Sequence, residues 1–251
     1  TVDSATVTIP VGGYFHNTAR VVPVTEGTTT ITASDERVES YRYTQASATV
    51  AVVTPSLAQS WGGGAEPLGI GQWVEPYVYT PDNQASALTV TVARANGAVS
   101  APATVTIPQG TYYVYHRFTG VAVGVDTVTY TAPGHLAATG RFSVGLGRVD
   151  GIGGWPGTLS TDSVQVTLYT RDPAGNPRNV AAATTFNVSV SSGALELRSG
   201  GATITSVTVP ANTSSVSFWL RRLANGTATV TFTNANYTTH ISPTVTVTGL
   251  P

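Results

Sequence analysis

One six-residue stretch occurs three times in this chain, and its spacing constrains the fold more than any other feature. It reads ATVTIP at residues 5–10 and again at residues 103–108, and TSVTVP at residues 205–210. The prolines that close the three copies lie 98 and 102 residues apart. A period of about 100 residues matches the length of one small β-sandwich domain. The chain is therefore predicted to be a tandem repeat of sandwich domains.

Within each copy, apolar and hydroxylated residues alternate. In the middle copy Ala103, Val105 and Ile107 alternate with threonine, which places the apolar side chains on one face of a strand. The closing proline ends the strand because it has no amide hydrogen to donate. A turn follows, and it carries Gly12, Gly110 or Asn212 in the three copies.

Further alternating strands follow each copy, and helical periodicity is nearly absent. On the strand after the turn in the last copy, the expected inward residues are Val216, Phe218 and Leu220. On the next strand they are, in the three copies, Ile31 and Ala33, Val128 and Tyr130, and Val230 and Phe232. On the closing strand they are Ala48, Val50 and Val52, then Phe142, Val144 and Leu146, and then Val245 and Val247. The predicted fold class is all-β: tandem immunoglobulin-like antiparallel β-sandwiches, the first one incomplete.

The front half of the repeat occurs only in the second and third copies, where residues 74–82 align with residues 164–172. The expected domains are the C-terminal half of a sandwich at residues 1–55, and complete sandwiches at 56–150 and 151–251. We expect the beginning of the first domain to lie outside this numbering. The alternative is that another chain supplies the missing strands. The extra residues of the third copy are expected in loops, at 172–178 and near 191–201.

Composition narrows the class of partner. Charged residues make up 10% of the chain, the net charge is −1, and all twelve cations are arginine, so a nucleic-acid surface is not expected. No apolar run is long enough to span a bilayer. The absence of cysteine removes disulfides and zinc–thiolate sites, and it favours a bacterial or viral exterior. No export leader opens the chain, so we expect a mature product or a piece of something longer.

The run SVQVTLYTRDPAGNP at residues 163–177, followed by TTFNVSVSSG at residues 184–193, resembles bacterial immunoglobulin-like domains of the invasin and intimin type. The ATVTIP stretch with its following strands is similar to tandem immunoglobulin-like repeats of large bacterial surface proteins. The resemblance covers most of the chain and implies a stalk that projects an adhesive or structural element. It also implies a strand-to-strand turn at 172–178, although the middle copy has only Pro81-Asp82-Asn83 in that place.

No pattern of an enzyme or a metal site is found. The chain has no Gly-x-Ser-x-Gly elbow, and its histidines, His16, His116, His135 and His240, lack the spacing of a zinc helix. We expect His116 to be partly buried and bonded to a hydroxyl or a carbonyl. Calcium stays open as an alternative, with Asp150 at a domain joint, but no Asp-x-Asp string supports it. No catalytic residue, cofactor or metal ligand is predicted.

The candidate interaction surface is aromatic. If Val74, Val78, Val114 and Phe118 face the core, large rings of the same strands must face away. These are Trp73, Tyr77, Tyr79, Tyr113 and Tyr115, and Trp219 is a weaker case in the third copy. Exposed aromatic patches mark contact surfaces. Three alternatives are open: the rings pack on a neighbouring domain or subunit, lie under the segment 57–70 with Trp61, or bind glycan.

The sequence therefore favours a non-enzymatic structural or adhesive module of an extracellular bacterial surface or filament protein, acting as a spacer or an assembly unit. Its expected partners are other copies of itself or neighbouring surface proteins, with glycan as a further possibility. The alternatives are a module of a phage virion decoration or tail fibre, and a carbohydrate-binding accessory domain.

Overall fold

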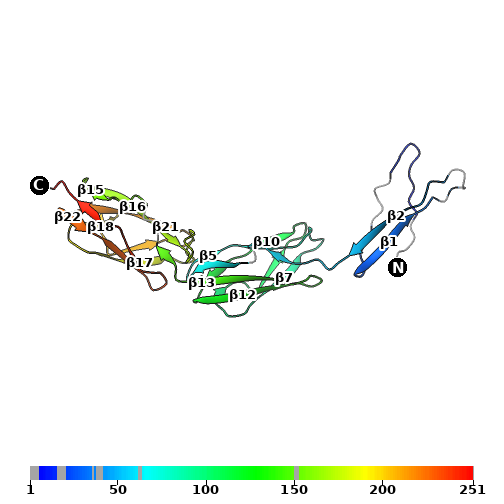
Figure 1. The fold of residues 1–251 in the computed structure, drawn as a ribbon, viewed down its shortest axis with the longest axis horizontal. Helices are drawn as coiled ribbons and strands as arrows, with labels where there is room; N and C mark the ends of the chain where they lie inside the picture. The colour runs from blue at the N-terminus through cyan, green and yellow to red at the C-terminus, as the bar shows by residue number, and fades with distance from the viewer. Residues whose placement is uncertain are drawn as a thin grey trace. The chain divides into compact units, whose positions relative to one another are not determined.

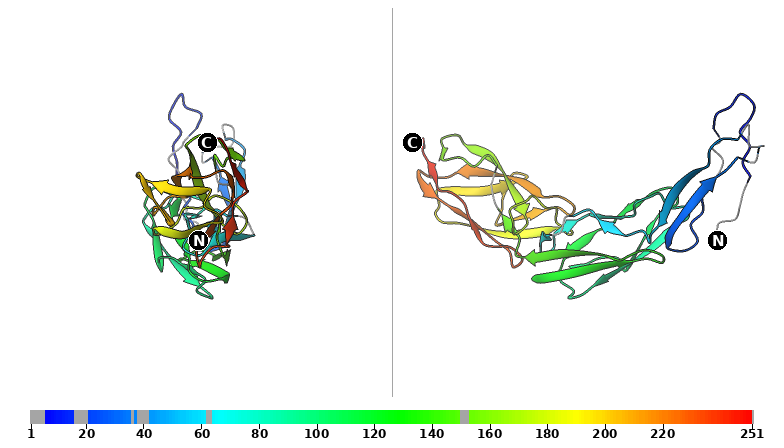
Figure 2. Two further views of the ribbon diagram at one scale, coloured as in Figure 1. Left: turned by 90° about the vertical axis from the view of Figure 1, so that its left-hand side faces the viewer. Right: turned by 45° about the vertical axis from the view of Figure 1, so that its right-hand side comes forward.

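The computed structural model describes residues 6–15, 21–35, 37, 42–61, 64–149 and 153–250. Every regular element in these residues is a β-strand, and Figures 1 and 2 show the ribbon without a helix. The predicted all-β class of immunoglobulin-like sandwiches is confirmed. None of the described residues forms a helix of the length and hydropathy that crossing a bilayer requires. The chain divides into two compact units, Thr1–Pro55 and Ser56–Pro251.

The first unit contains one described hairpin. Strand β1 (Gly27–Ala33) pairs antiparallel with β2 (Ala46–Val52), in a register that runs from Gly27 opposite Val52 to Ala33 opposite Ala46. The prediction of a strand at residues 5–10 is wrong for the residues that the structure describes, because residues 6–10 belong to no strand. In both other copies this strand pairs with one from the front half of the repeat, and the described part of the first unit holds no such strand.

The middle sandwich, in the second unit, has two layers. Its larger sheet has the order β4 (Ala65–Gly69), β13 (Ala138–Gly145), β12 (Gly124–Thr131), β7 (Leu88–Arg94) and β9 (Thr104–Ile107). The opposite layer consists of two short sheets, β10 (Tyr113–Tyr115), β6 (Tyr77–Tyr79) and β3 (Ala58–Gln59), and β5 (Trp73–Val74), β11 (Phe118–Gly120) and β8 (Val99–Ser100).

Aromatic rings fill the core between these layers. Phe118, Tyr130 and Phe142 are fully buried, and the ring of Trp61 packs 4.9 Å from that of Phe142. Val128 and Tyr130 are inward as the alternation predicts. Leu146 was expected to face inward but is 40% exposed, because strand β13 ends at Gly145 and the alternation ends with it.

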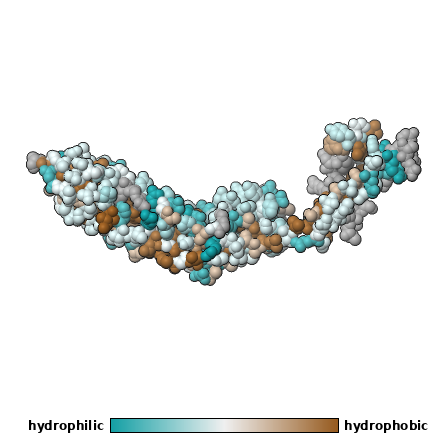
Figure 3. Space-filling view, in the orientation of Figure 1, coloured by the Kyte–Doolittle hydropathy of each residue, from teal (hydrophilic) through white to brown (hydrophobic). Residues whose placement is uncertain are grey.

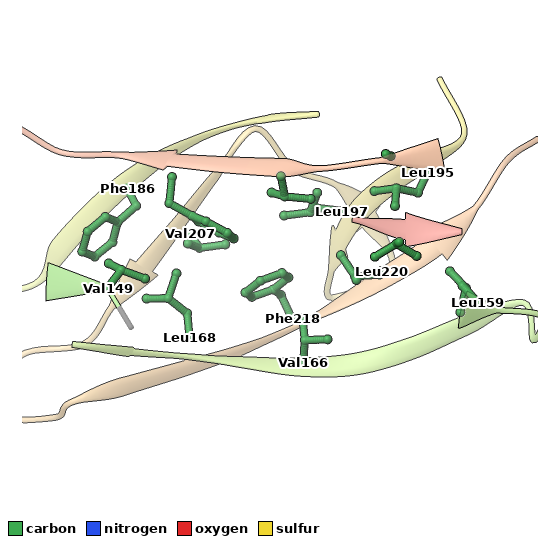
Figure 4. Packing of buried hydrophobic residues seen from close by; sticks show 14 of the residues in the cluster. Val149, Leu159, Val166, Leu168, Phe186, Leu195, Leu197, Val207, Phe218 and Leu220 are labelled. Atoms are coloured by element: carbon green, nitrogen blue, oxygen red, sulfur yellow. The ribbon is translucent and has the colours of Figure 1, made fainter. Parts of the chain in front are cut away.

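The last sandwich repeats this plan. One sheet has the order β14 (Arg148–Val149), β16 (Ser163–Arg171), β21 (Ser215–Arg222), β18 (Leu195–Ser199) and β19 (Ala202–Thr203). Facing it are β15 (Thr158–Leu159), β25 (Val245–Val247) and β22 (Gly226–Ala228), and β20 (Ser206–Val209), β17 (Thr184–Val190), β23 (Val230–Thr233) and β24 (His240–Ile241). Figure 4 shows Phe218, Val166 and Leu168 within the core between these strands.

Two details differ from the expected pairing. Strands β4 and β15 run parallel to β13 and β25, whereas the sequence predicts only antiparallel pairs. A strand near the start of a sandwich reaches the last strand through a long connection, so no hairpin forces the two to run in opposite directions. The extra residues near 191–201 were expected in a loop, but they form β18, which pairs with β21 and extends that sheet.

The turn that ends the repeated stretch is the same in all three copies. Its second residue after the proline has a positive φ: 83° at Gly12, 78° at Gly110 and 61° at Asn212. Glycine and asparagine adopt this conformation most readily. The next threonine hydroxyl then donates to the carbonyl of the proline, over 3.0 Å in the middle copy and 2.8 Å in the last.

Candidate interaction surface

The strands β6 and β10 bring four of the predicted rings together. Their register sets Tyr113 opposite Tyr79 and Tyr115 opposite Tyr77. Val78 between the rings is fully buried, so the tyrosines lie on the outer face of the sheet. Tyr113 is 37% exposed and Tyr115 57% exposed. We call this group, with the neighbouring Tyr112, the tyrosine surface.

Tyr112 is missing from the predicted set although it is 45% exposed. It precedes strand β10, so the alternation of that strand gives no information about its direction. Its ring centroid lies 5.0 Å from that of Tyr113. The adjacent letters Tyr112-Tyr113 were the one sequence feature that pointed to it.

The rings of the tyrosine surface pack edge to face or tilted, and none of these contacts is a parallel stack. Tyr77 lies 5.6 Å from Tyr79, 5.7 Å from Tyr113 and 5.2 Å from Tyr115, with interplanar angles of 51°, 65° and 73°. Edge-to-face contacts are the favoured geometry of aromatic pairs. They also tilt the rings out of one plane, so the surface is a ribbed cluster and does not form the flat array that would stack on a sugar chain.

Trp73 lies apart from the tyrosine surface. The guanidinium carbon of Arg117 lies 3.8 Å from the Trp73 ring centroid, so a cation covers one face of the indole. Arg117 also pairs with Glu75 at 3.2 Å and donates to the Asn212 side chain of the last sandwich at 3.0 Å. The backbone amide of Trp73 donates to the carbonyl of Asn179. Trp73 therefore belongs to the contact between the two sandwiches.

Trp219 is 43% exposed on β21 and borders a shallow depression of ≈ 370 Å³. The other residues that line it are Asp162, Ser163, Arg198, Gly201 and Arg221. Glu196 accepts from Arg221 over 3.1 Å and lies 3.8 Å from Arg198. A hydrogen bond from the Thr203 hydroxyl, supported by the two arginines, lowers the pKa of Glu196. An exposed ring thus stands beside a fixed set of charged groups.

The segment 57–70 does not lie over the tyrosine surface in its described part. Ala58 and Gln59 form β3, which extends the same sheet beside β6. Trp61 points into the core, where it contacts Phe118 and Phe142. On the face drawn in Figure 3, pale colours of intermediate hydropathy dominate the second unit, with separate brown apolar patches.

His116 is where the sequence predicts it, on the inward side of its strand. It is 6% exposed, and its Nε2 lies 2.8 Å from the hydroxyl of Tyr130. Burial lowers the pKa of His116 and raises the pKa of Tyr130, because both charged forms lose solvation. The pair sits inside the core, away from the tyrosine surface.

A buried polar joint, which sequence reasoning missed, connects the middle and last sandwiches. At its centre lies Gln72, which is fully buried. Its Oε1 accepts from the amide of Gly69 at 2.9 Å, and its Nε2 donates to the carbonyl of Arg171 at 2.8 Å and to the hydroxyl of Tyr237 at 3.3 Å. Gln72, which is shielded from solvent, is therefore hydrogen-bonded to both sandwiches.

A backbone bridge and an arginine complete the joint. The amide of Ala181 donates to the carbonyl of Gly71 at 2.7 Å. Arg178 contacts Glu66 of the middle sandwich and lies 3.1 Å from Asp172 of its own. Asp172 is fully buried and accepts from the amide of Asn176 at 2.9 Å, and Gly175 has a φ of 94°. The strand-to-strand turn expected at 172–178 is therefore confirmed.

The described residues contain no group of three histidine, aspartate or glutamate side chains placed to hold a metal ion. Asp150, the candidate for calcium at the joint, lies outside the described residues, as does His16.

No known protein family profile matches the chain, and no curated protein matches it. Solved structures do match in part. They include the adhesin InvE of Yersinia pseudotuberculosis (12% identity, TM-score 0.35, 77% of this chain and 58% of that one) and the D00-D0 domain of intimin (10%, 0.34, 76% and 99%). A β-glycosidase from Bacteroides vulgatus matches at 12% identity and a TM-score of 0.33, over 78% of this chain.

This chain spans 25% of the length of that glycosidase chain. TM-scores this low assign the chain to none of these proteins. The fold class rests on the strand pairing described above: the second unit consists of two immunoglobulin-like β-sandwiches, joined through buried polar contacts.

Proposed function

We propose that this chain is a non-enzymatic structural and adhesive module of an extracellular bacterial surface or filament protein, with successive domains at residues 1–55, 56–150 and 151–251. Within it, the two complete sandwiches act as one spacer. The observation that carries the proposal is the buried polar joint. A flexible linker would leave such groups in water, whereas here Gln72 is fully buried and bonds to both sandwiches.

The physical reason is the loss of hydrogen bonds between the sandwiches, each worth about 0.5–1.5 kcal/mol net of the water that replaces the partner. If the sandwiches parted, the bonds from Gln72 to the carbonyl of Arg171 and to the hydroxyl of Tyr237 would both be exchanged for bonds to water. Contacts between domains of one chain are usually small and allow relative motion. A joint with a buried glutamine, an arginine between two carboxylates and paired backbone restricts that motion, and stiffness is the property that a spacer needs.

The experiment is ¹⁵N relaxation on residues 56–251, measured separately for amides of the two sandwiches. A stiff spacer predicts one common rotational correlation time, as for a single particle. The Gln72→Ala and Arg178→Ala double variant should shorten the apparent time and give each sandwich its own value. Gln84→Ala, which alters a glutamine in a turn of the middle sandwich, is the matched control. Two independent correlation times in the unaltered protein would contradict the spacer proposal.

The surface location needs its own test. An antibody against residues 56–251 should label intact cells of the source bacterium, and external protease should remove the label without lysis. Labelling only after lysis would contradict the extracellular part of the proposal and leave the spacer part standing.

The Trp219 depression favours carbohydrate binding as a second candidate function. An exposed indole offers an apolar π face to the C–H face of a sugar, and Arg198, Arg221 and Asp162 offer hydrogen bonds to hydroxyls around it. The test is a glycan array with the unaltered chain and with Trp219→Ala. Tyr77→Ala is the control, because Tyr77 lies on the ribbed tyrosine surface. Binding that persists in Trp219→Ala, or no binding at all, would end this candidate.

A further inference from the structure

Strand β10 is an edge strand, and its outer edge is open. It is the first strand in the sheet β10-β6-β3. The carbonyl of Tyr112 accepts from the amide of Thr80 at 2.8 Å, and the amide of His116 donates to the carbonyl of Pro76 at 3.0 Å. Backbone groups of alternate residues point to opposite sides of a strand. The amides and carbonyls of Tyr113 and Tyr115 therefore point away from β6. Among the described residues β10 pairs with no other strand, and no turn or loop backbone group bonds to these amides and carbonyls.

Apart from its short length of three residues, this open edge carries no device that keeps edges from pairing. Natural edge strands are protected by charged residues, proline or bulges. The segment TYYVYH at residues 111–116 contains no carboxylate, no lysine or arginine, and no proline. All three tyrosines of this segment are exposed: Tyr112 at 45%, Tyr113 at 37% and Tyr115 at 57%. The edge thus offers both unpaired backbone groups and uncharged aromatic area.

The last sandwich shows how the same position looks without this surface. Its strand β21 has Ser215 and Ser217 where β10 has Tyr113 and Tyr115. Ser217 bonds to the Thr167 hydroxyl at 2.9 Å. The fold therefore accepts serine at both positions, and the tyrosines of β10 are not required for packing a sandwich of this type.

We propose that β10 pairs with β10 of a second copy of this chain, antiparallel and centred on Val114. The Tyr-Val-Tyr pattern of the strand is symmetric about Val114, so a two-fold axis there sets Tyr113 opposite Tyr115 of the second copy, twice. Each such pair closes two N–H···O=C bonds between outward groups. The two-fold operation brings no like charges together, because the segment has none. Both partners use the same patch, which is the form of a closed dimer interface.

The pairing joins the two short sheets into one, in the order β3-β6-β10-β10-β6-β3. Side chains opposite each other in an antiparallel pair lie on the same face. The two tyrosine surfaces therefore become continuous, and their rings meet edge to face across the axis. This inference deepens the assembly role in the proposed function by naming the partner. It does not depend on the stiffness of the joint, so the two can fail separately.

The first test is the oligomeric state of the 251-residue chain by sedimentation equilibrium over a wide range of concentration. The proposal predicts a reversible dimer that Tyr113→Ser/Tyr115→Ser weakens at least tenfold. Circular dichroism should show an unchanged fold, since serine already occupies the equivalent positions. Trp219→Ser, which removes an exposed ring elsewhere, is the control and should leave the dimer constant unchanged. A chain that stays monomeric at the highest concentration overturns the proposal.

The second test determines which residues of the two β10 strands lie opposite each other, and it does not depend on how stable the dimer is. The chain has no cysteine, so single cysteines report without background. Opposite residues of a bonded pair have Cα atoms about 5.5 Å apart, within the reach of a disulfide, whereas residues more than about 7 Å apart cannot be joined. A mixture of Tyr113→Cys and Tyr115→Cys chains should form a mixed disulfide under mild oxidation. Either variant alone should form little intermolecular disulfide. Equal yields in all three samples, or a dimer insensitive to the serine pair, would refute pairing through β10.

Discussion

Replacing Gln72 with alanine should cost more stability than its single side chain suggests, because it leaves partners of the two sandwiches unbonded. In the intact joint, Oε1 accepts from Gly69 at 2.9 Å and Nε2 donates to the carbonyl of Arg171 at 2.8 Å. Alanine leaves the Gly69 amide and the Arg171 carbonyl without these partners, at about 1–3 kcal/mol each. The expected loss is about 2–6 kcal/mol, with the lower end applying if water enters the vacated space.

The assay is urea unfolding of residues 56–251, followed by tryptophan fluorescence. The four tryptophans of the chain divide evenly, with Trp61 and Trp73 in the middle sandwich and Trp155 and Trp219 in the last. For a protein of this size a loss of 1 kcal/mol lowers the melting temperature by about 2–4 °C, so thermal unfolding should shift by several degrees. The middle and last sandwiches should also begin to unfold at different urea concentrations, since the joint couples them.

Gln84→Ala is the matched control. Gln84 also uses its Nε2 in two hydrogen bonds, to the Thr80 hydroxyl at 2.9 Å and to the carbonyl of Asp82 at 3.1 Å, but it is not fully buried. Water can replace its bonds, so we expect a loss of about 1 kcal/mol or less. If Gln72→Ala shifts the midpoint no more than Gln84→Ala, the buried joint does not stabilise the unit and the reasoning is refuted.

Three other measurements test the core and the joint. Phe218 is 1% exposed, so Phe218→Ala should cost about 3–5 kcal/mol in urea unfolding; less than 1 kcal/mol would contradict the packing of the last sandwich. Burial lowers the pKa of His116 below its ordinary 6.5, so the unfolded chain binds the proton first. Stability should therefore fall as the pH drops below about 6.5, and His116→Gln should flatten this slope; parallel pH profiles for the two proteins would refute it. A Cβ added at Gly147 would lie 2.5 Å from the Tyr237 ring, so Gly147→Ala should cost about 1–3 kcal/mol; an unchanged melting temperature would show that the ring moves freely.

The local features of this fold were predictable from sequence because they depend on short-range alternation. A period of two in the strands places Val128 and Tyr130 inside, and the same rule places Tyr113 and Tyr115 outside. The turn after the repeated stretch could be predicted equally well, since glycine or asparagine must supply a positive φ. These predictions needed only the residues on one strand or in one turn.

The features that were missed depend on partners far away in the chain. The strand expected at residues 5–10 has the right alternation, but a strand needs a neighbour, and the described part of the first unit provides none. Gln72 bonds to residues 99 and 165 positions further on, and no local period connects them. The ribbed geometry of the tyrosine surface also depends on ring orientations, which alternation leaves undetermined.

The backbone bridge at the joint has a mechanical consequence. Gly71 and Trp73 bond to Ala181 and Asn179, so two points far apart in the chain are held together directly. When tension is applied outside these two points, the bridge carries the load across the residues that lie between them. Those residues can extend only after the bridge has broken. The joint would thus shield most of the middle sandwich from pulling force, and that part of the chain would not add to the extension until the bridge broke.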